Sequence, residues 1–117
     1  MVVGVLRLQV YFPASRSLKD KRQGVRRICD RVRHKFNVAV AEVGGLDTWQ
    51  RSSLGVVVVG NENSHVQSML DKIAAFIEQL YVGQILEQEQ ELLHYGEDEA
   101  LNPGAPHGIP DLDGRGV

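Results

Sequence analysis

The spacing of apolar residues changes period along this chain, and that change limits the folds open to it. From residue 2 to 12 apolar residues alternate, so that Leu6, Leu8, Val10 and Phe12 share one face, as in a strand with one buried side. From residue 66 to 80 apolar residues recur every three or four positions, as on one face of a helix. From end to end, residues 1–95 predict strands and helices in the order β-α-β-β-α-β.

The two helices are predicted from their apolar spacing and their starts. Ser17, with Asp20 three residues on, resembles an N-cap, because a serine hydroxyl accepts a free backbone N–H. Ser64 with Gln67 fits a capping box for the second helix, which Gly83 is expected to end. The apolar side of the first helix is formed by Leu18, Val25, Ile28, Cys29, Val32 and Phe36.

Three further strands are predicted. Residues 36–43 and 49–60 flank the turn at 44–47 and form an antiparallel hairpin. The run Val56–Val59 suggests a central strand. Residues 85–95 are ambiguous, because their Glu, Gln and Leu favour a helix by propensity. We predict a strand there, since the sheet otherwise keeps an unpaired edge.

This order predicts an α+β, ferredoxin-like βαββαβ sandwich with a four-stranded antiparallel sheet and two helices on one face. The domain spans residues 1–95. Residues 96–117 hold 5 Gly, 3 Pro and 5 acidic residues, a composition that predicts a flexible tail. The topology brings the loop before the first helix and the turn of the hairpin to one end of the sheet, which places Arg16 and Lys19 near Asp47 and residues 49–51.

Composition excludes several classes of protein. A single cysteine rules out an internal disulfide and zinc sites built from several thiolates. No apolar run approaches the roughly 20 residues of a membrane helix, and no secretory signal is visible. We therefore expect a cytoplasmic protein that does not enter the membrane.

Charge is distributed unevenly. Residues 1–51 carry 11 Lys/Arg and 4 Asp/Glu, whereas residues 52–117 carry 2 and 11. On the first helix, Lys19, Arg22, Arg26 and Arg33 fall in a strip about 60° wide, and Arg27, Arg31 and Lys35 form a second strip. Such a face can bind phosphates. Two alternatives stay open: a solvated surface and a site for an acidic protein. An arginine excess favours phosphate, since guanidinium binds it bidentately.

The turn of the hairpin is a second candidate site. Trp49 beside Arg51 can stack on an unpaired base, but we favour a Trp49 that plugs the open end of the sandwich, with Asp47 and Arg51 paired across the turn. Arg51 and Gln50 are expected to face solvent. The predicted nucleic-acid-binding residues are therefore Arg16, Lys19, Arg22, Arg26, Arg33, Trp49, Gln50 and Arg51.

The sheet face away from the helices is a third candidate. It carries Val3, Val5, Arg7, Gln9 and Tyr11 of the first strand. RNA-recognition modules stack bases on paired aromatic residues of this face, which are absent here. Its half-apolar character favours a homodimer.

No catalytic or metal-binding constellation is apparent. The four histidines are dispersed, Cys29 lies on the apolar side of its helix, and the sequence has neither a P-loop nor a dinucleotide glycine motif. Three alternating glutamates (Glu87, Glu89 and Glu91) are expected to be solvated. We therefore predict a protein without catalytic activity, cofactor or metal.

Four segments resemble the YlxP-like family of small bacterial proteins of unknown function: residues 17–22 (SLKDKR), 36–43 (FNVAVAEV), 47–51 (DTWQR) and 54–55 (LG). The resemblance covers residues 1–95 and implies a ferredoxin-like fold and a link to genes of translation and ribosome maturation. It supplies no catalytic residues and does not extend to the tail. The prediction is an RNA-binding accessory factor of translation or ribosome assembly. The alternative is a dimeric scaffold for an acidic protein partner.

Overall fold

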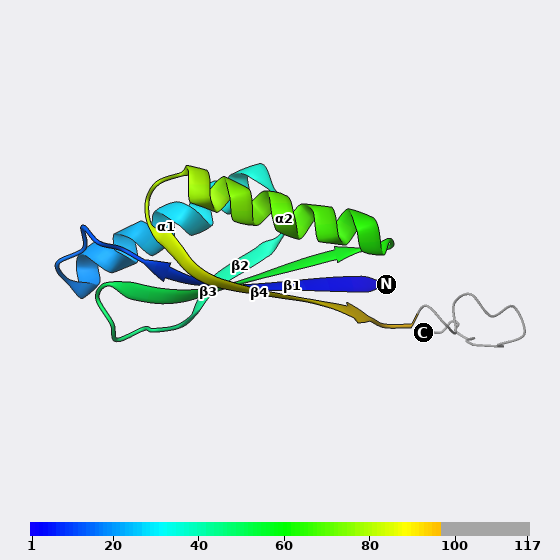
Figure 1. Ribbon diagram of the computed structural model, residues 1–117, viewed down its shortest axis with the longest axis horizontal. Helices are drawn as coiled ribbons and strands as arrows, with labels where there is room; N and C mark the ends of the chain where they lie inside the picture. The colour runs from blue at the N-terminus through cyan, green and yellow to red at the C-terminus, as the bar shows by residue number, and fades with distance from the viewer. Residues whose placement is uncertain (97–117) are drawn as a thin grey trace, which may run out of the picture.

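A computed structural model describes residues 1–96 and has the predicted order of elements (Figure 1). The strands are β1 (Val2–Tyr11), β2 (Ala39–Gly44), β3 (Arg51–Gly60) and β4 (Gln84–His94). The helices are α1 (Leu18–Lys35) and α2 (Asn63–Gln79). The predicted tail falls almost wholly on residues 97–117, which lie outside the described part of the chain, so the domain boundary stays a prediction.

The four strands form one antiparallel sheet in the order β2-β3-β1-β4. Both helices lie on the same side of this sheet (Figure 1). The prediction of an α+β, ferredoxin-like sandwich is therefore confirmed. β3 and β1 form the centre, and β2 and β4 form the edges. Within residues 1–96, no helix lies over the other face of the sheet.

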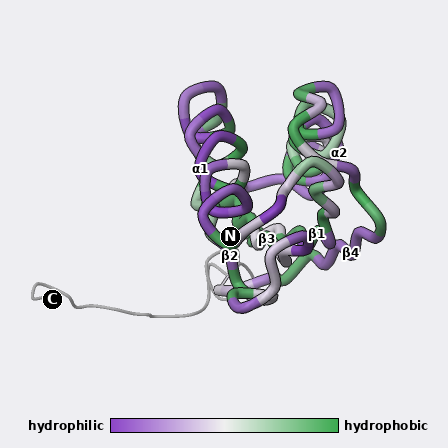
Figure 2. The backbone as a smooth tube through the Cα atoms, turned by 90° about the vertical axis from the view of Figure 1, so that its left-hand side faces the viewer, coloured by the Kyte–Doolittle hydropathy of each residue, from purple (hydrophilic) through white to green (hydrophobic). Residues whose placement is uncertain are grey.

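The core lies between the sheet and the helices. Even-numbered residues of β1 and β3 point into it, including Leu6, Leu8, Leu54 and Val56, all fully buried. Both helices turn apolar sides towards the sheet, and the outer side of α1 is strongly hydrophilic (Figure 2). The alternation predicted from residues 2–12 thus sets which face of β1 is buried.

The start of α1 has the predicted cap. The Ser17 hydroxyl accepts the backbone N–H of Asp20 at 3.0 Å. Gly24 fits this helix for a reason that the sequence does not reveal. A Cβ atom at position 24 would lie 2.9 Å from Cε1 of Phe12, so only glycine lets the buried Phe12 ring pass so close to the helix.

The predicted capping box of α2 is wrong. The helix begins at Asn63, and its N-cap, Glu62, lies two residues before the predicted cap and makes no hydrogen bond through its side chain. Ser64 therefore lies inside the first turn, and the Gln67 side chain instead bonds Asp71 and Gln90. The helix ends at Gln79, before the predicted stop at Gly83.

Two strand boundaries also differ from the prediction. The α1 helix continues to Lys35, and the Phe36 backbone N–H bonds the Val32 carbonyl as the C-cap, so β2 begins at Ala39. The turn keeps Trp49 and Gln50 out of the ladder, so β3 begins at Arg51. Residues 84–94 do form a strand, because pairing with β1 along its length satisfies the backbone groups that a sheet edge would expose.

Candidate nucleic-acid interface

The loop before α1 and the turn of the β2–β3 hairpin meet at one end of the sheet, as the topology predicts. The Ser15 hydroxyl donates to the Trp49 carbonyl, and the Gln50 Nε2 donates to the Ser15 carbonyl at 3.1 Å. The Phe12 backbone N–H bonds the Gln50 carbonyl at 2.8 Å. These bonds fix the start of α1 against the hairpin. We call this region the hairpin end.

The prediction that Gln50 faces solvent is wrong. Its side-chain amide is used to join the two loops, and the residue is half-buried. The prediction that Trp49 plugs the sandwich is also wrong, because Trp49 is 48% exposed. Phe12, 4% exposed, already fills this end of the core from β1, so the indole has no apolar space to enter.

A buried ion pair also anchors α1 to the hairpin. The Lys21 side chain is fully buried, and its Nζ lies 2.8 Å from Oε2 of Glu42 and 2.6 Å from the Gly45 carbonyl. The Ser52 hydroxyl donates to the same Glu42 oxygen at 2.7 Å. Lys21 belongs to neither of the two cation strips predicted from the sequence. Its position on the apolar side of α1, next to Leu18 and Val25 on the helical wheel, was the available signal.

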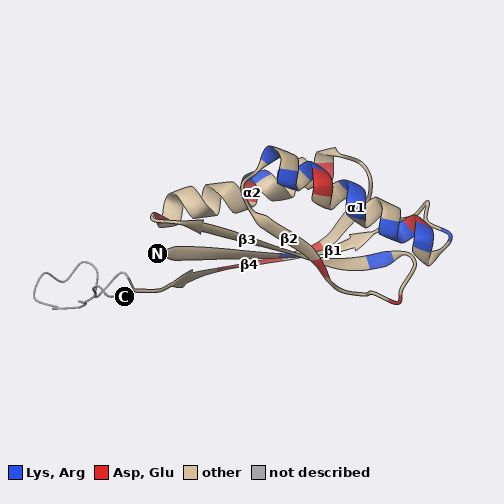
Figure 3. Cartoon of the chain, turned by 180° about the vertical axis from the view of Figure 1, so that it is seen from behind, with Lys and Arg blue, Asp and Glu red and all other residues tan. Residues whose placement is uncertain are grey.

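Three cations of the first strip are exposed beside this anchor. Lys19, Arg22 and Arg26 all point to solvent, and none of them forms an ion pair within residues 1–96. Figure 3 shows the concentration of basic residues on α1. Arg16 is exposed just before the helix, with its backbone N–H held by Asp20. We call these four residues the α1 cation row.

Arg33 belongs to the same strip but is engaged. Its Nη2 donates to the Val40 carbonyl at 2.8 Å, and its Nη1 lies 3.4 Å from Oδ1 of Asp30. Arg33 thus provides a hydrogen-bond donor for a backbone carbonyl of the edge strand β2. Half of its side chain stays exposed.

Arg51 is separated from the α1 cation row by the sheet. It pairs with Tyr11 in the ladder, at an odd position of β3, and these positions face away from the helices. Within the described residues, no ion pair joins Arg51 to Asp47, so the predicted pair across the turn is not formed. The eight predicted residues therefore do not form one patch: four line the start of α1, while Arg51 projects on the other side.

The second predicted strip lies on the side of α1 that faces α2. Arg27 and Arg31 are exposed, and Lys35 Nζ lies 5.2 Å from the centre of the Phe76 ring, a cation–π contact between the helices. Phe36 and Phe76 meet edge to face there, at 5.5 Å between ring centres. Lys35 therefore helps to join the helices.

The titratable groups of residues 1–96 form no site typical of metal or nucleophilic chemistry. No group of three or more His, Cys, Asp or Glu residues is placed to hold a metal ion in this part of the chain. Burial raises the pKa of the Cys29 thiol, partly offset by nearby Arg33, so this thiol is protonated at neutral pH. Across the same residues, neither helix is both long and apolar enough to cross a membrane.

The comparisons with known proteins identify a family and give no activity. A family model described as "Protein of unknown function (DUF503)" matches residues 3–90. The chain is 44% identical over 62 residues to a protein of Bacillus subtilis (strain 168) named "Uncharacterized protein YlxP". The aligned part is 53% of this chain and 67% of that relative.

Proposed function

Because the chain belongs to the DUF503 family, whose function is unknown, we propose a function from its surface. We propose that it is a non-catalytic, RNA-binding accessory factor of translation or ribosome assembly. The α1 cation row would hold phosphates of the RNA. The link to translation is the one that the YlxP-like resemblance implies.

The observation that carries this proposal is the set of exposed cations that have no carboxylate partner among residues 1–96. Lys19, Arg22 and Arg26 follow one another at intervals of three and four residues, so their side chains are neighbours on one side of α1. An exposed cation gives up little hydration when it meets a phosphate, and each contact releases a counterion from the RNA. The anchor at Lys21 holds this row in a fixed place.

Two features favour RNA over an acidic protein. Arginine, which binds phosphate through two parallel N–H bonds, outnumbers lysine in the row by three to one. Trp49, half-exposed at the same end, offers a ring on which an unpaired base can stack. The open sheet face lacks paired aromatic residues, so recognition would depend on shape and charge.

The test is a titration of a fluorescent RNA hairpin by anisotropy at 50 and 200 mM KCl. Three phosphate contacts give a slope of about −2.7 in the logarithm of affinity against that of salt, or about 40-fold weaker binding at the higher concentration. The variant Arg22→Gln/Arg26→Gln removes two positive charges and is expected to lower the slope by about 1.8.

Lys72→Glu is the matched control. It changes the net charge by the same two units, at an exposed position on α2 far along the chain from the row. Binding close to wild type for Lys72→Glu, with weak binding for the double variant, supports the proposal. Equal loss in both variants, or a slope near zero for the wild type, contradicts it. Copurification with an acidic protein and no nuclease-sensitive material would favour the scaffold alternative.

A further inference from the structure

The face of the sheet away from the helices is apolar over β2, half of β1 and the part of β3 that follows Arg51, whose side chain also lies on this face. Odd-numbered residues of β1 and β3 point to this face, and three valines on it are well exposed: Val43 (59%), Val57 (38%) and Val59 (64%). Val57 stands between Ala39 of β2 and Val5 of β1 in the ladder. We call this surface the open face. Its apolar residues are Val3, Val5, Ala39, Ala41, Val43, Val57 and Val59.

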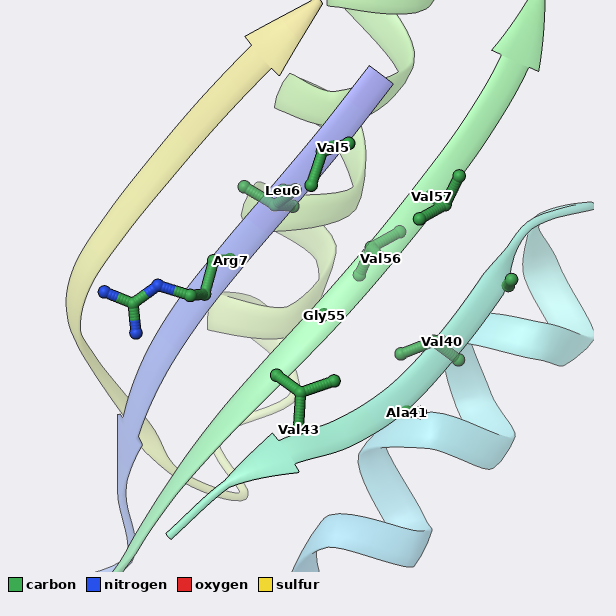
Figure 4. Close-up of a pocket in the computed structure, with 10 residues that line it drawn as sticks. Val5, Leu6, Arg7, Val40, Ala41, Val43, Gly55, Val56 and Val57 are labelled. Atoms are coloured by element: carbon green, nitrogen blue, oxygen red, sulfur yellow. The ribbon is translucent and has the colours of Figure 1, made fainter. Parts of the chain in front are cut away.

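A hollow lies in this apolar part. Gly55 forms its floor, and the side chain of Val43 leans over that glycine, while Arg7 extends towards β4 (Figure 4). A Cβ at position 55 would lie 3.1 Å from Cγ1 of Val43. The hollow has a volume of about 350 Å³ and an almost wholly apolar lining. Contact of such an apolar surface with water is unfavourable, so its burial by a partner would lower the free energy.

The remaining part of the open face is acidic. Along β4, Glu87, Glu89 and Glu91 lie opposite Gln9, Arg7 and Val5 of β1. Arg7 pairs with the middle glutamate at 2.8 Å, which leaves the outer two carboxylates exposed and without an ion pair among the described residues. The open face therefore has an apolar side at β2 and β3 and an acidic column on β4.

We propose that a second copy of this chain covers the open face, related by a two-fold axis that runs along the strands over the central pair β3–β1. Charge selects this axis. A two-fold axis across the strands would lay the acidic column of one copy on that of its partner, which is repulsive. An axis along the strands instead lays the column of each copy over the β2 side of the other.

The β2 side suits that column. Its open-face residues are Ala39, Ala41 and Val43, which carry no charge. Its free edge carries the half-exposed guanidinium of Arg33, fixed at the Val40 carbonyl. A two-fold rotation about the strand direction leaves the position of each residue along the strands unchanged. Glu91 lies in the same row as Ala39, because both are linked through Val5 and Val57, and therefore arrives over Ala39 of the second copy, on the strand whose free edge carries Arg33.

The size of the face predicts a weak dimer. The four strands lie about 4.8 Å apart and rise about 3.3 Å per residue; three of them have 10, 10 and 11 residues and β2 has 6, which gives on the order of 600 Å² per copy. The total, roughly 1,200 Å², is at the lower limit of specific interfaces, so a dissociation constant in the micromolar range is expected.

The same axis has a consequence that rests on the proposed function. A rotation about the strand direction leaves the hairpin ends of both copies at the same end of the dimer. The two α1 cation rows would then lie at the same end of the dimer, one on each of its outer faces, because the helices of each copy lie on the side of the sheet away from the contact. An axis across the strands would send them to opposite ends.

Sedimentation equilibrium of the full chain from 1 to 200 µM tests the dimer. We expect a monomer–dimer equilibrium for the wild type and a monomer for Val57→Glu, which puts a charge at the centre of the apolar surface. Tyr81→Glu is the control, because Tyr81 is 87% exposed in the loop between α2 and β4 and not on the open face. Circular dichroism identifies any variant that fails to fold. A monomeric wild type at 200 µM, or equal dimerisation of Val57→Glu, overturns the proposal.

A second variant tests the direction of the axis. Glu87→Gln/Glu91→Gln is expected to weaken the dimer several-fold at 50 mM KCl, because the column lies over the strand whose free edge carries Arg33. An axis across the strands predicts the opposite, a stronger dimer, since repulsion is removed. The variant Arg22→Gln/Arg26→Gln separates the two proposals: it should lose RNA and keep the dimer, whereas failure of the dimer alone leaves RNA binding by the monomer intact.

Discussion

Replacing Lys21 with methionine is expected to destabilise the fold more than its place in a basic helix would suggest. Methionine keeps the apolar stem of the side chain and removes only the ammonium group. In the wild type this group is fully buried and bonds both Glu42 and the Gly45 carbonyl. The substitution leaves the Glu42 carboxylate with the Ser52 hydroxyl as its remaining donor among these contacts.

The magnitude follows from the burial of the two partners. Removal of one member of a buried ion pair costs about 3–5 kcal/mol, because the other charge stays buried without compensation. The Glu42 side chain is 14% exposed, so water reaches part of its carboxylate. We therefore expect the lower end, about 3 kcal/mol. At a urea dependence of about 2 kcal/mol per molar, the midpoint of unfolding falls by about 1.5 M.

The double variant Lys21→Met/Glu42→Gln separates the ion pair from packing. It removes both charges and keeps an acceptor for Ser52. Because replacement of a whole buried pair by neutral groups is often close to neutral, the double variant should recover at least half of the lost stability. Lys19→Met is the control on the same helix: its side chain is exposed, so a change within about 0.5 kcal/mol is expected.

Urea unfolding followed by circular dichroism gives all four free energies. The reasoning is refuted if Lys21→Met costs no more than Lys19→Met. It is equally refuted if the double variant is less stable than Lys21→Met, since the cost would then arise from packing or from the lost hydrogen bonds and not from an unpaired charge.

Two other perturbations test the core. Alanine favours a helix by about 1 kcal/mol over glycine. Gly24→Ala should nevertheless leave the thermal midpoint unchanged or lower it, because the new Cβ meets the Phe12 ring at 2.9 Å. An increase in stability equal to the full propensity gain would contradict this packing. Burial raises the pKa of the Cys29 thiol, so at pH 8 Ellman's reagent should modify the native chain more slowly than the urea-unfolded chain. Because the folded-state pKa of this thiol is the higher one, the stability that the thiol contributes is present below about pH 8.5 and is lost as the pH rises past the raised pKa. The free energy of unfolding of the wild type, relative to that of Cys29→Ala, should therefore fall over this range, and a constant difference would disprove the prediction.

Local patterns were sufficient for the element order. The alternation in β1 and the three-to-four spacing in α2 follow from which side of each element is buried, and this pattern can be read from the residues of that element alone. The Ser17 cap was predictable for the same reason, because its donor is only three residues away. The α2 cap was not: Ser64 has the right residue type, but the chain enters the helix at Asn63.

The candidate site was predicted only in part. Sequence periodicity placed Lys19, Arg22 and Arg26 on one side of α1, and the structure leaves them exposed. It could not distinguish Lys21 from its neighbours, because the partner that allows its burial, Glu42, is 21 residues away. Gln50 and Trp49 were misjudged for a related reason: Gln50 bonds Ser15, 35 residues away, and Phe12 occupies the end of the core that was predicted for Trp49.

The amino-acid order by itself determined the fold class, the buried side of each element and the concentration of cations on α1, because burial periodicity and charge are properties of short segments. The tertiary structure alone decided which cations are available. Lys21 is buried against Glu42, Arg33 is bound to an edge carbonyl, and Arg51 projects on the far side of the sheet. Strand pairing also created the open face, because Arg7, Gly55 and Glu89 lie far apart in the chain and form one row only when the sheet sets their register.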